Sequence, residues 1–239
     1  MVEAIMSSAA SRIAEQGDDW STNGWALLAG FLGADELGEL RREAERLCDD
    51  QSLFGARGAV PNSAGRSDRL DPVIDLSPPF AALAEDRRLL SIIDEALGGE
   101  AQLFKDKFIA KPPGAGGYAA HQDGAYWPGL DLDLNRFLTA MIFLDESTAE
   151  KGTIECASGH HRQLLTDPDT IADPDEAALG PFATIEAKAG DLVLIHALTP
   201  HRSGPNRSAA MRRAILFTYG VDPRPDLYDL YKQFQKRIR

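Results

Sequence analysis

The sequence has little of what membrane proteins, disulfide-bonded domains and zinc modules require. Its 239 residues contain no apolar run close to the roughly 20 residues that a membrane-spanning helix needs. Its two cysteines, Cys48 and Cys156, provide neither a disulfide framework nor the paired spacing of a zinc site. The N-terminal residues turn acidic early and lack the basic-then-apolar pattern of a signal peptide. We therefore predict a cytoplasmic protein with no membrane partner.

Basic residues are also scarce, with 25 Lys and Arg against 37 Asp and Glu and a formal net charge of -12. Nucleic acid is not expected as a partner, because phosphate binding needs a basic surface. The acidity is interpreted as a contribution to solubility. Hydrophobic residues make up 44% of the chain, which is enough for one full core. We predict one domain over residues 1–239.

Helical patterns dominate the first hundred residues. Apolar residues at three- and four-residue spacings predict one buried helix stripe, formed by Leu37, Leu40, Ala44 and Leu47. Asp35 is the candidate N-cap of that helix. A second helix is predicted over residues 79–97, interrupted near Asp86 and ended by two glycines. Shorter predictions are a helix at 9–16, a strand at 24–28, an irregular segment at 51–78 and a last helix at 226–239.

From residue 101 onward, short strand-like runs alternate with turn residues. They fall at 102–110, 136–144, 153–156, 182–187, 191–196 and 213–220. Helices followed by many short strands predict a mainly β fold with flanking helices, built on an antiparallel barrel or a double-sheet jelly roll. We expect a helix-rich part at 1–100, the core at about 101–220 and a C-terminal tail at 221–239. The polar stretch at 166–180 is predicted to be a long surface loop.

The triplet His121-Gln122-Asp123 is the sharpest local signal. In an extended segment, residues i and i+2 point to the same face, so an imidazole and a carboxylate would lie side by side. Two histidines and one carboxylate on one face of a metal are diagnostic of non-haem iron(II) oxygenases. The triplet alone is weak evidence, because exposed polar turns produce it as well.

Four other histidines could supply the second imidazole, and the residues alone leave the choice open: His160, His161, His196 and His201. The first two fall in an expected loop, where a solvent-exposed turn is the simpler interpretation. The third ends an apolar strand, and the fourth opens the turn that follows it. Further along, the planar fork of Arg212 suits a dicarboxylate. In an alternating strand, one of Arg212 and Arg213 faces inward and the other faces water.

Taken together, four ordered blocks of this sequence resemble the phytanoyl-CoA dioxygenase family of iron(II)/2-oxoglutarate oxygenases. The resemblance covers roughly residues 25–219. The blocks are 23–32; 111–114 with 121–123 and 126–128; 143–146 with 151–154 and 158–160; and 190–193 with 201–208 and 212–214. It implies a double-stranded β-helix (jelly-roll, cupin-like) core, Fe(II), 2-oxoglutarate as cosubstrate and O2.

The resemblance also implies a role for particular residues. His121, Asp123 and His201 would be the metal ligands and the catalytic centre. Arg212 would bind the far carboxylate of 2-oxoglutarate, and Ser203 would assist it. His196 stands where the family often has a histidine that is not a ligand.

Further contacts are implied less directly. Lys107, Thr139 and Met141 fall where the family places additional cosubstrate contacts, and Lys105 shares a strand face with Lys107 and could take its place. Substrate contacts are expected at two aromatic residues after the metal motif, which could equally be core packing: Tyr126 and Trp127.

The implied reaction is oxidation of a C–H bond in a small molecule, with release of succinate and CO2. Asp123 fills the position that related halogenases leave open for chloride, so hydroxylation is favoured over halogenation. Desaturation, ring closure and epimerisation stay open, and the expected context is secondary metabolism. Two rival classes also remain: a cupin-like metal enzyme, which would not need Arg212, and a non-catalytic β-barrel binding protein.

Overall fold

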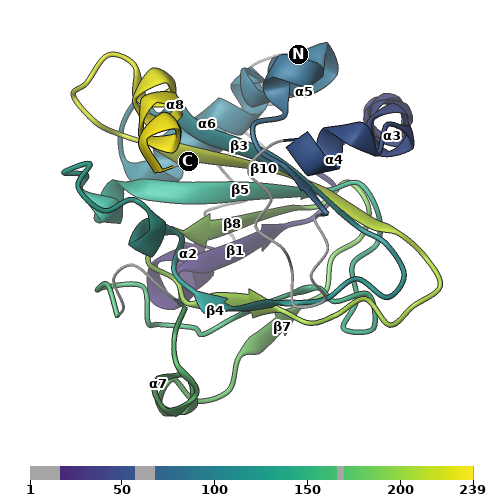
Figure 1. The fold of residues 1–239 in the computed structure, drawn as a ribbon. Helices are drawn as coiled ribbons and strands as arrows, with labels where there is room; N and C mark the ends of the chain where they lie inside the picture. The colour runs from purple at the N-terminus through teal and green to yellow at the C-terminus, as the bar shows by residue number, and fades with distance from the viewer. Residues whose placement is uncertain (1–16, 57–67, 166–169, 239) are drawn as a thin grey trace.

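The computed structural model describes residues 17–56, 68–165 and 170–238, and two antiparallel sheets form its centre (Figure 1). The larger sheet has the strand order β1-β8-β5-β10-β3-β2, and the smaller one has the order β4-β9-β6-β7. The larger sheet comprises β1 (Trp25–Leu28), β2 (Arg69–Leu70), β3 (Gln102–Lys111), β5 (Phe137–Phe143), β8 (Leu192–His196) and β10 (Arg212–Gly220). The smaller comprises β4 (Tyr118–His121), β6 (Ile154–Cys156), β7 (Ala183–Ile185) and β9 (His201–Ser203). This arrangement confirms the predicted mainly β, jelly-roll core.

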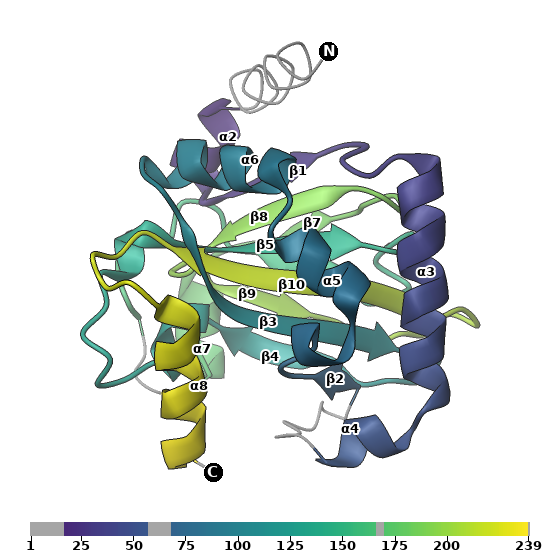
Figure 2. The same ribbon diagram turned by 90° about the horizontal axis from the view of Figure 1, so that it is seen from above.

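Helices cover the outer face of the larger sheet (Figure 2). In total, the described residues form the helices α2 (Gly17–Asn23), α3 (Ala34–Asp49), α4 (Ser52–Ala56), α5 (Pro78–Ala84), α6 (Arg87–Leu97), α7 (Asp173–Ala178) and α8 (Leu227–Ile238). They also form the 3-10 turns η1 (Ile74–Leu76), η2 (Asp123–Tyr126) and η3 (Leu134–Arg136). One apolar cluster joins α3, α5 and α6 to the outward residues of β3, β5, β8 and β10. Within the described ranges, no helix combines the length and apolar composition that crossing a membrane requires.

The predicted stripe of α3 is confirmed, because Leu40, Ala44 and Leu47 are buried in that outer cluster. The prediction of Asp35 as its N-cap is wrong. The helix begins at Ala34, the cap position is Gly33, and no side chain caps it. Asp35 lies in the first turn instead, where a carboxylate still interacts favourably with the helix dipole.

The predicted interruption near Asp86 is confirmed. Helix α5 ends at Ala84, and the Asp86 side chain caps α6 by accepting a hydrogen bond from the backbone N–H of Arg88. Gly98 then ends α6 in the left-handed conformation, at φ 67°. The last predicted helix corresponds to α8.

Two segments predicted to be irregular contain regular structure. The range 51–78 includes α4, η1 and the two-residue strand β2, and 166–180 includes α7. Elements this short carry no sequence period, which is why the pattern did not indicate them. The helix predicted at 9–16 and the positions 166–169 lie outside the described residues.

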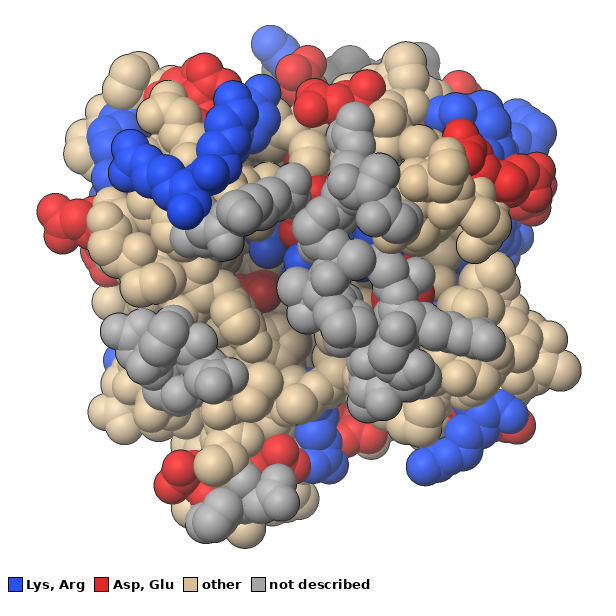
Figure 3. Space-filling view, in the orientation of Figure 1, with Lys and Arg blue, Asp and Glu red and all other residues tan. Residues whose placement is uncertain are grey.

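The space between the sheets is filled by a second apolar cluster that includes Ile109, Met141 and Leu216. Strand β3 contributes alternate residues to this inner side, so Lys107 and Lys111 lie on the same face as Ile109. Aliphatic and charged side chains therefore share the interior of the barrel. Figure 3 shows a hollow in the middle of one face of the molecule, with both basic and acidic atoms at its bottom.

Candidate metal centre and cosubstrate site

Strand pairing brings the two candidate histidine ligands together. His121 ends β4, His201 begins β9, and the two are direct partners in the antiparallel register. Their ring centroids are 4.2 Å apart. Sequence analysis placed His201 at the opening of a turn, but it is the first residue of a strand, and this position faces it toward His121.

Asp123 also lies beside these two histidines, although its local structure differs from the predicted one. It is not part of an extended strand, because β4 ends at His121 and Asp123 begins η2. Gln122 anchors the bend, since its buried side chain donates hydrogen bonds to the carbonyls of Gln163 and Leu198. One potential ligand atom from each of the three residues, two imidazole nitrogens and a carboxylate oxygen, lies within 4.8 Å of the others.

In both histidines, hydrogen bonding of Nδ1 leaves the Nε2 atom of the imidazole available to a metal. The Nδ1 atom of His121 is 2.8 Å from the Ala119 carbonyl oxygen, and that of His201 is 2.9 Å from the Thr199 carbonyl oxygen. A carbonyl only accepts, so each Nδ1 carries the proton and each Nε2 has a free lone pair. Burial, and then His201, lower the pKa of His121 to about 3, and burial lowers that of His201. Both rings are therefore neutral at physiological pH.

Asp123 is held in its ionised form. Burial alone would raise its pKa, but nearby positive charge, that of Lys107 first, lowers that pKa well below its usual range. The Lys107 ammonium lies 3.7 Å from the carboxylate, and the Thr139 hydroxyl donates to it at 2.9 Å. Two neutral imidazoles and one carboxylate are the donor set that suits non-haem Fe(II). The residues present therefore fit the metal.

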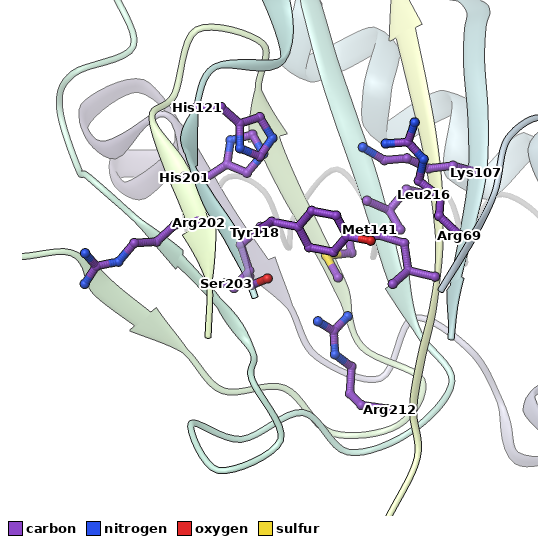
Figure 4. A pocket seen from close by; sticks show the side chains of 12 residues that line it. Arg69, Lys107, Tyr118, His121, Met141, His201, Arg202, Ser203, Arg212 and Leu216 are labelled. Atoms are coloured by element: carbon purple, nitrogen blue, oxygen red, sulfur yellow. The ribbon is translucent and has the colours of Figure 1, made fainter. Parts of the chain in front are cut away.

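A pocket opens beside these ligands (Figure 4). His121 and His201 lie on one side of it, and Arg69 and Lys107 lie on another. Met141 and Ser203, which are predicted to contact the cosubstrate, also line the pocket. Thr139 does not line it, and its contacts are with Asp123 and the hydroxyl of Thr218.

Arg212 enters the pocket as a buried cation with unused donors. Its side chain is among the largest that are fully buried, and Nη2 donates to the Gly152 carbonyl at 2.9 Å. Nε and Nη1 have no hydrogen-bond partner among the described residues. Burial lowers the pKa of Arg212 to about 10, so it stays charged at neutral pH. Arg213 faces the other way and pairs with Asp145 at 2.8 Å, which confirms the predicted alternation.

Lys111 is a second cation at this end of the pocket, and sequence analysis gave it no role. It lies directly opposite Arg212 in the pairing of β3 with β10, although like charges in that position repel. Its ammonium donates to Ser203 Oγ at 3.0 Å and to the Gly204 carbonyl at 2.7 Å. Burial, and then Arg212, lower the pKa of Lys111 to about 7. Among the described residues neither of these buried cations forms an ion pair with a carboxylate, so together they suit a carboxylate ligand.

The remaining predicted residues lie in different surroundings. Lys107 lines the pocket, whereas Lys105 pairs with Asp71 at 3.6 Å. Tyr126 is 39% exposed and packs edge-on against His121. Trp127 does not line the pocket and is buried among Phe104, Phe137 and residues of α8. Of the two interpretations of Trp127, core packing therefore holds.

The other histidines lie apart from the metal ligands. His196 ends β8 and packs against Trp20 and His161, with ring centroids 5.9 Å and 5.4 Å away. His161 is buried and His160 is half-buried, so the exposed turn that was the simpler expectation for both residues is wrong.

The sequence profile described as phytanoyl-CoA dioxygenase matches residues 20–214. The chain belongs to this family. A 2-aminoethylphosphonate dioxygenase from an uncultured bacterium is 28% identical over 212 residues, which span 86% of this chain and 80% of that protein. A methylphosphonate hydroxylase from Gimesia maris is 28% identical over 92% of this chain and 85% of its own length.

Solved structures share the fold. EctD from S. alaskensis, crystallised with 2-oxoglutarate and 5-hydroxyectoine, has a TM-score of 0.79 at 24% identity and covers 87% of this chain and 76% of its own. The epimerase SnoN, in complex with Fe3+, alpha ketoglutarate and nogalamycin RO, has a TM-score of 0.72 at 25% identity, with 91% and 84% coverage. This family member is an iron(II)- and 2-oxoglutarate-dependent dioxygenase.

Proposed function

We propose that this dioxygenase hydroxylates, or otherwise oxidises, an unactivated C–H bond of a small molecule in secondary metabolism, releasing succinate and CO2. The observation that carries the proposal is the pocket itself. At one side stand two free imidazole nitrogens and an ionised carboxylate, and at the other stands a buried guanidinium with two unused donors. A metal held by His121, Asp123 and His201 and a dicarboxylate held by Arg212 would fit together in this space.

The bound iron would supply the activation of oxygen, and the protein's own residues bind and orient the reactants. Arg212 is placed to grip the far carboxylate through its free Nε and Nη1 donors, with Lys111 and Ser203 beside it. Thr139 fixes the orientation of the Asp123 carboxylate. Met141, Ile109 and Leu216 give the pocket an apolar wall that limits the access of water.

Several features support oxidation of a small molecule in particular. Asp123 supplies a carboxylate where a halogenase would need an open position, which favours hydroxylation. The relatives named above act on 2-aminoethylphosphonate and methylphosphonate, and further relatives are named ectoine dioxygenase. The nogalamycin epimerase supports a place in secondary metabolism. The unpaired donors of Arg212 favour the use of 2-oxoglutarate over the alternative of a cupin-like metal enzyme that does not need Arg212.

The test is release of succinate from 2-oxoglutarate by the full chain with Fe(II) and air. A panel of 2-aminoethylphosphonate, methylphosphonate and ectoine should identify a compound that raises succinate release and gains one oxygen atom, measured by mass spectrometry. Arg212→Gln should raise the KM for 2-oxoglutarate about tenfold or more, because a charge-assisted pair is lost.

Arg213→Gln is the matched control for Arg212→Gln. It removes the same charge one residue away, on the opposite face of β10, and should leave that KM within about twofold. Equal effects of the two substitutions would contradict the assignment of Arg212. Absence of succinate, with or without any panel compound, would contradict the proposed function.

A further inference from the structure

The pocket has a second cationic side, formed by Arg69 and Lys107 and separate from Arg212. Arg69 of β2 is paired with Ile109 of β3, and directly paired residues point to the same face of a sheet. Ile109 lines the pocket, and so do Arg69 and Lys107. Figure 4 shows the charged ends of Arg69 and Lys107 side by side, separate from Arg212.

A buried network holds this second side in place. Asp71 is 1% exposed and lies 3.3 Å from the Arg69 guanidinium and 3.6 Å from the Lys105 ammonium. Gln235 of α8 donates to the other oxygen of Asp71 at 2.9 Å. Tyr231 of the same helix places its ring 5.2 Å below the Lys105 ammonium. The cations are therefore fixed before any ligand binds, which lowers the entropic cost of binding.

The network leaves hydrogen-bonding capacity in the pocket. The Nε atom of Arg69 is buried and has no hydrogen-bond partner among the described residues. Lys107 forms an ion pair with the carboxylate of Asp123. A metal bound by that carboxylate would reduce its negative charge, which would leave more of the positive charge of Lys107 for a ligand. A guanidinium and an ammonium side by side form a site for an oxyanion with several acceptor atoms.

The charges around the pocket indicate how much negative charge a ligand should bring. Arg202 also lines the pocket, but it points away from it and is paired with Glu155 and Glu176. Without that cluster, five cations stand against three carboxylates in the described residues around the pocket: Arg69, Lys105, Lys107, Lys111 and Arg212 against Asp68, Asp71 and Asp123. The excess of positive charge is notable in a chain whose net charge is -12. A ferrous ion and a doubly charged 2-oxoglutarate cancel, so the positive charge of Arg69 and Lys107 remains for the substrate.

We infer that Arg69 and Lys107, supported by Lys105, form a subsite for a doubly charged oxyanion on the substrate, of the phosphonate class, occupied at the same time as the 2-oxoglutarate site. The inference rests on the proposed function, because it assumes that Arg212 and Lys111 take the cosubstrate. Arg69 sets specificity by binding the oxyanion and thereby placing the adjoining carbon beside the metal ligands.

Calorimetric titration tests this subsite without turnover. The full chain is loaded with Mn2+ in place of iron and saturated with 2-oxoglutarate, and methylphosphonate is added near pH 7.5. At that pH a substantial part of the phosphonate is doubly charged, and Lys107, whose pKa burial lowers to about 8, is still mostly charged. Methanesulfonate has the same tetrahedral shape and a single charge. Methylphosphonate should bind in the presence of 2-oxoglutarate, and methanesulfonate should bind about tenfold more weakly or worse.

Two matched substitutions separate the subsites. Arg69→Gln should weaken methylphosphonate binding about tenfold or more and change 2-oxoglutarate affinity less than about threefold. Arg202→Gln removes the same charge from the edge of the pocket, but Arg202 points away in Figure 4 and pairs with Glu155 and Glu176, so both affinities should be retained. Arg69→Lys keeps the charge and should restore part of the lost affinity if Arg69→Gln lowers the yield of folded protein.

The outcomes distinguish the inference from the proposed function. Displacement of 2-oxoglutarate by methylphosphonate, or equal binding of the sulfonate, would overturn the separate dianion subsite and leave the cosubstrate site intact. Failure of methylphosphonate to bind while 2-oxoglutarate still binds would overturn the subsite in the same way. Failure of 2-oxoglutarate itself to bind would instead contradict the proposed function.

Discussion

The hydroxyl of Thr139 connects the sheet to the metal-binding carboxylate. It donates to Asp123 at 2.9 Å and shares a hydrogen bond with the hydroxyl of Thr218. Sequence comparison suggested a contact with the cosubstrate, but the observed contact is with a metal ligand. Residues that hold metal ligands in this way affect metal affinity strongly.

Thr139→Val should therefore weaken Mn2+ binding by about tenfold to a hundredfold, because Asp123 loses its oriented donor. Thr218→Val is the matched control, since it removes the neighbouring hydroxyl and leaves the bond between Thr139 and Asp123. Calorimetric titration of Mn2+ into each variant measures the effect. Equal losses in the two variants would show that the hydroxyl pair matters only for packing.

Gly152 is required by both its backbone angle and its surroundings. Its φ is 68°, and an added Cβ would lie 2.3 Å from the Gly204 carbonyl oxygen. Its own carbonyl accepts hydrogen bonds from Arg212 and Lys111, so the turn also positions the two cations. Gly114 has a similar φ of 76° but no atom within 4 Å of an added Cβ.

The pair Gly152→Ala and Gly114→Ala separates crowding from backbone strain. Gly114→Ala should cost about 1 kcal/mol of unfolding free energy, from the left-handed conformation alone. Gly152→Ala should cost about 2–4 kcal/mol, because the clash adds to the strain. Urea denaturation measures both, and an equal cost would mean that the Gly204 turn moves aside freely.

At the scale of elements, helix α8 packs behind β3, on the side away from the pocket. The Tyr228 hydroxyl donates to Asp106 at 2.7 Å, and Asp106 also accepts hydrogen bonds from the backbone N–H groups of Val73 and Ile74. This carboxylate thus joins α8, β3 and the segment after β2. Burial raises the pKa of Asp106 in spite of these donors.

Tyr228→Phe should lower the free energy of unfolding by about 1–2 kcal/mol, because the buried Asp106 loses one of its donors. The two backbone donors remain, so the fold and the content of helix should persist in circular dichroism. Urea denaturation gives the change in stability. A variant as stable as the parent would indicate that α8 is held by its apolar contacts alone.

The sequence predicted elements best where a period was long enough to detect. The stripe of α3 and the break at Asp86 needed only local spacing and caps. Strand β2 is two residues long, and its place beside β3 depends on pairing across 40 positions of chain. The role of Lys111 was missed for the same reason, since only the register of β3 with β10 sets it opposite Arg212. The resemblance predicted His201, whereas spacing alone left four histidines open.

At the scale of the whole molecule, the fold keeps most of its histidines neutral. Burial lowers the pKa of His121 to about 3 and of His196 to about 4, and it also lowers the pKa values of His161 and His201. In the unfolded chain these imidazoles titrate near their ordinary value of 6.5. Below that pH the unfolded chain therefore binds more protons than the folded protein, so acid favours unfolding.

Metal-free protein should accordingly lose stability as the pH falls from about 6.5 toward 4, before most carboxylates titrate. Urea denaturation at a series of pH values measures the slope. His121→Asn removes one of the four groups and should make the slope shallower. A slope unchanged by that substitution would mean that the imidazole of His121 is protonated equally in the folded and unfolded chains.

The repulsion between Lys111 and Arg212 extends beyond the pocket, because both cations lie in the central strands of the larger sheet. In the proposed cosubstrate site, a dicarboxylate beside these cations would relieve that repulsion only in the folded protein, so it would shift the folding equilibrium by mass action. We therefore expect this polypeptide to resist proteolysis longer as the concentration of 2-oxoglutarate rises.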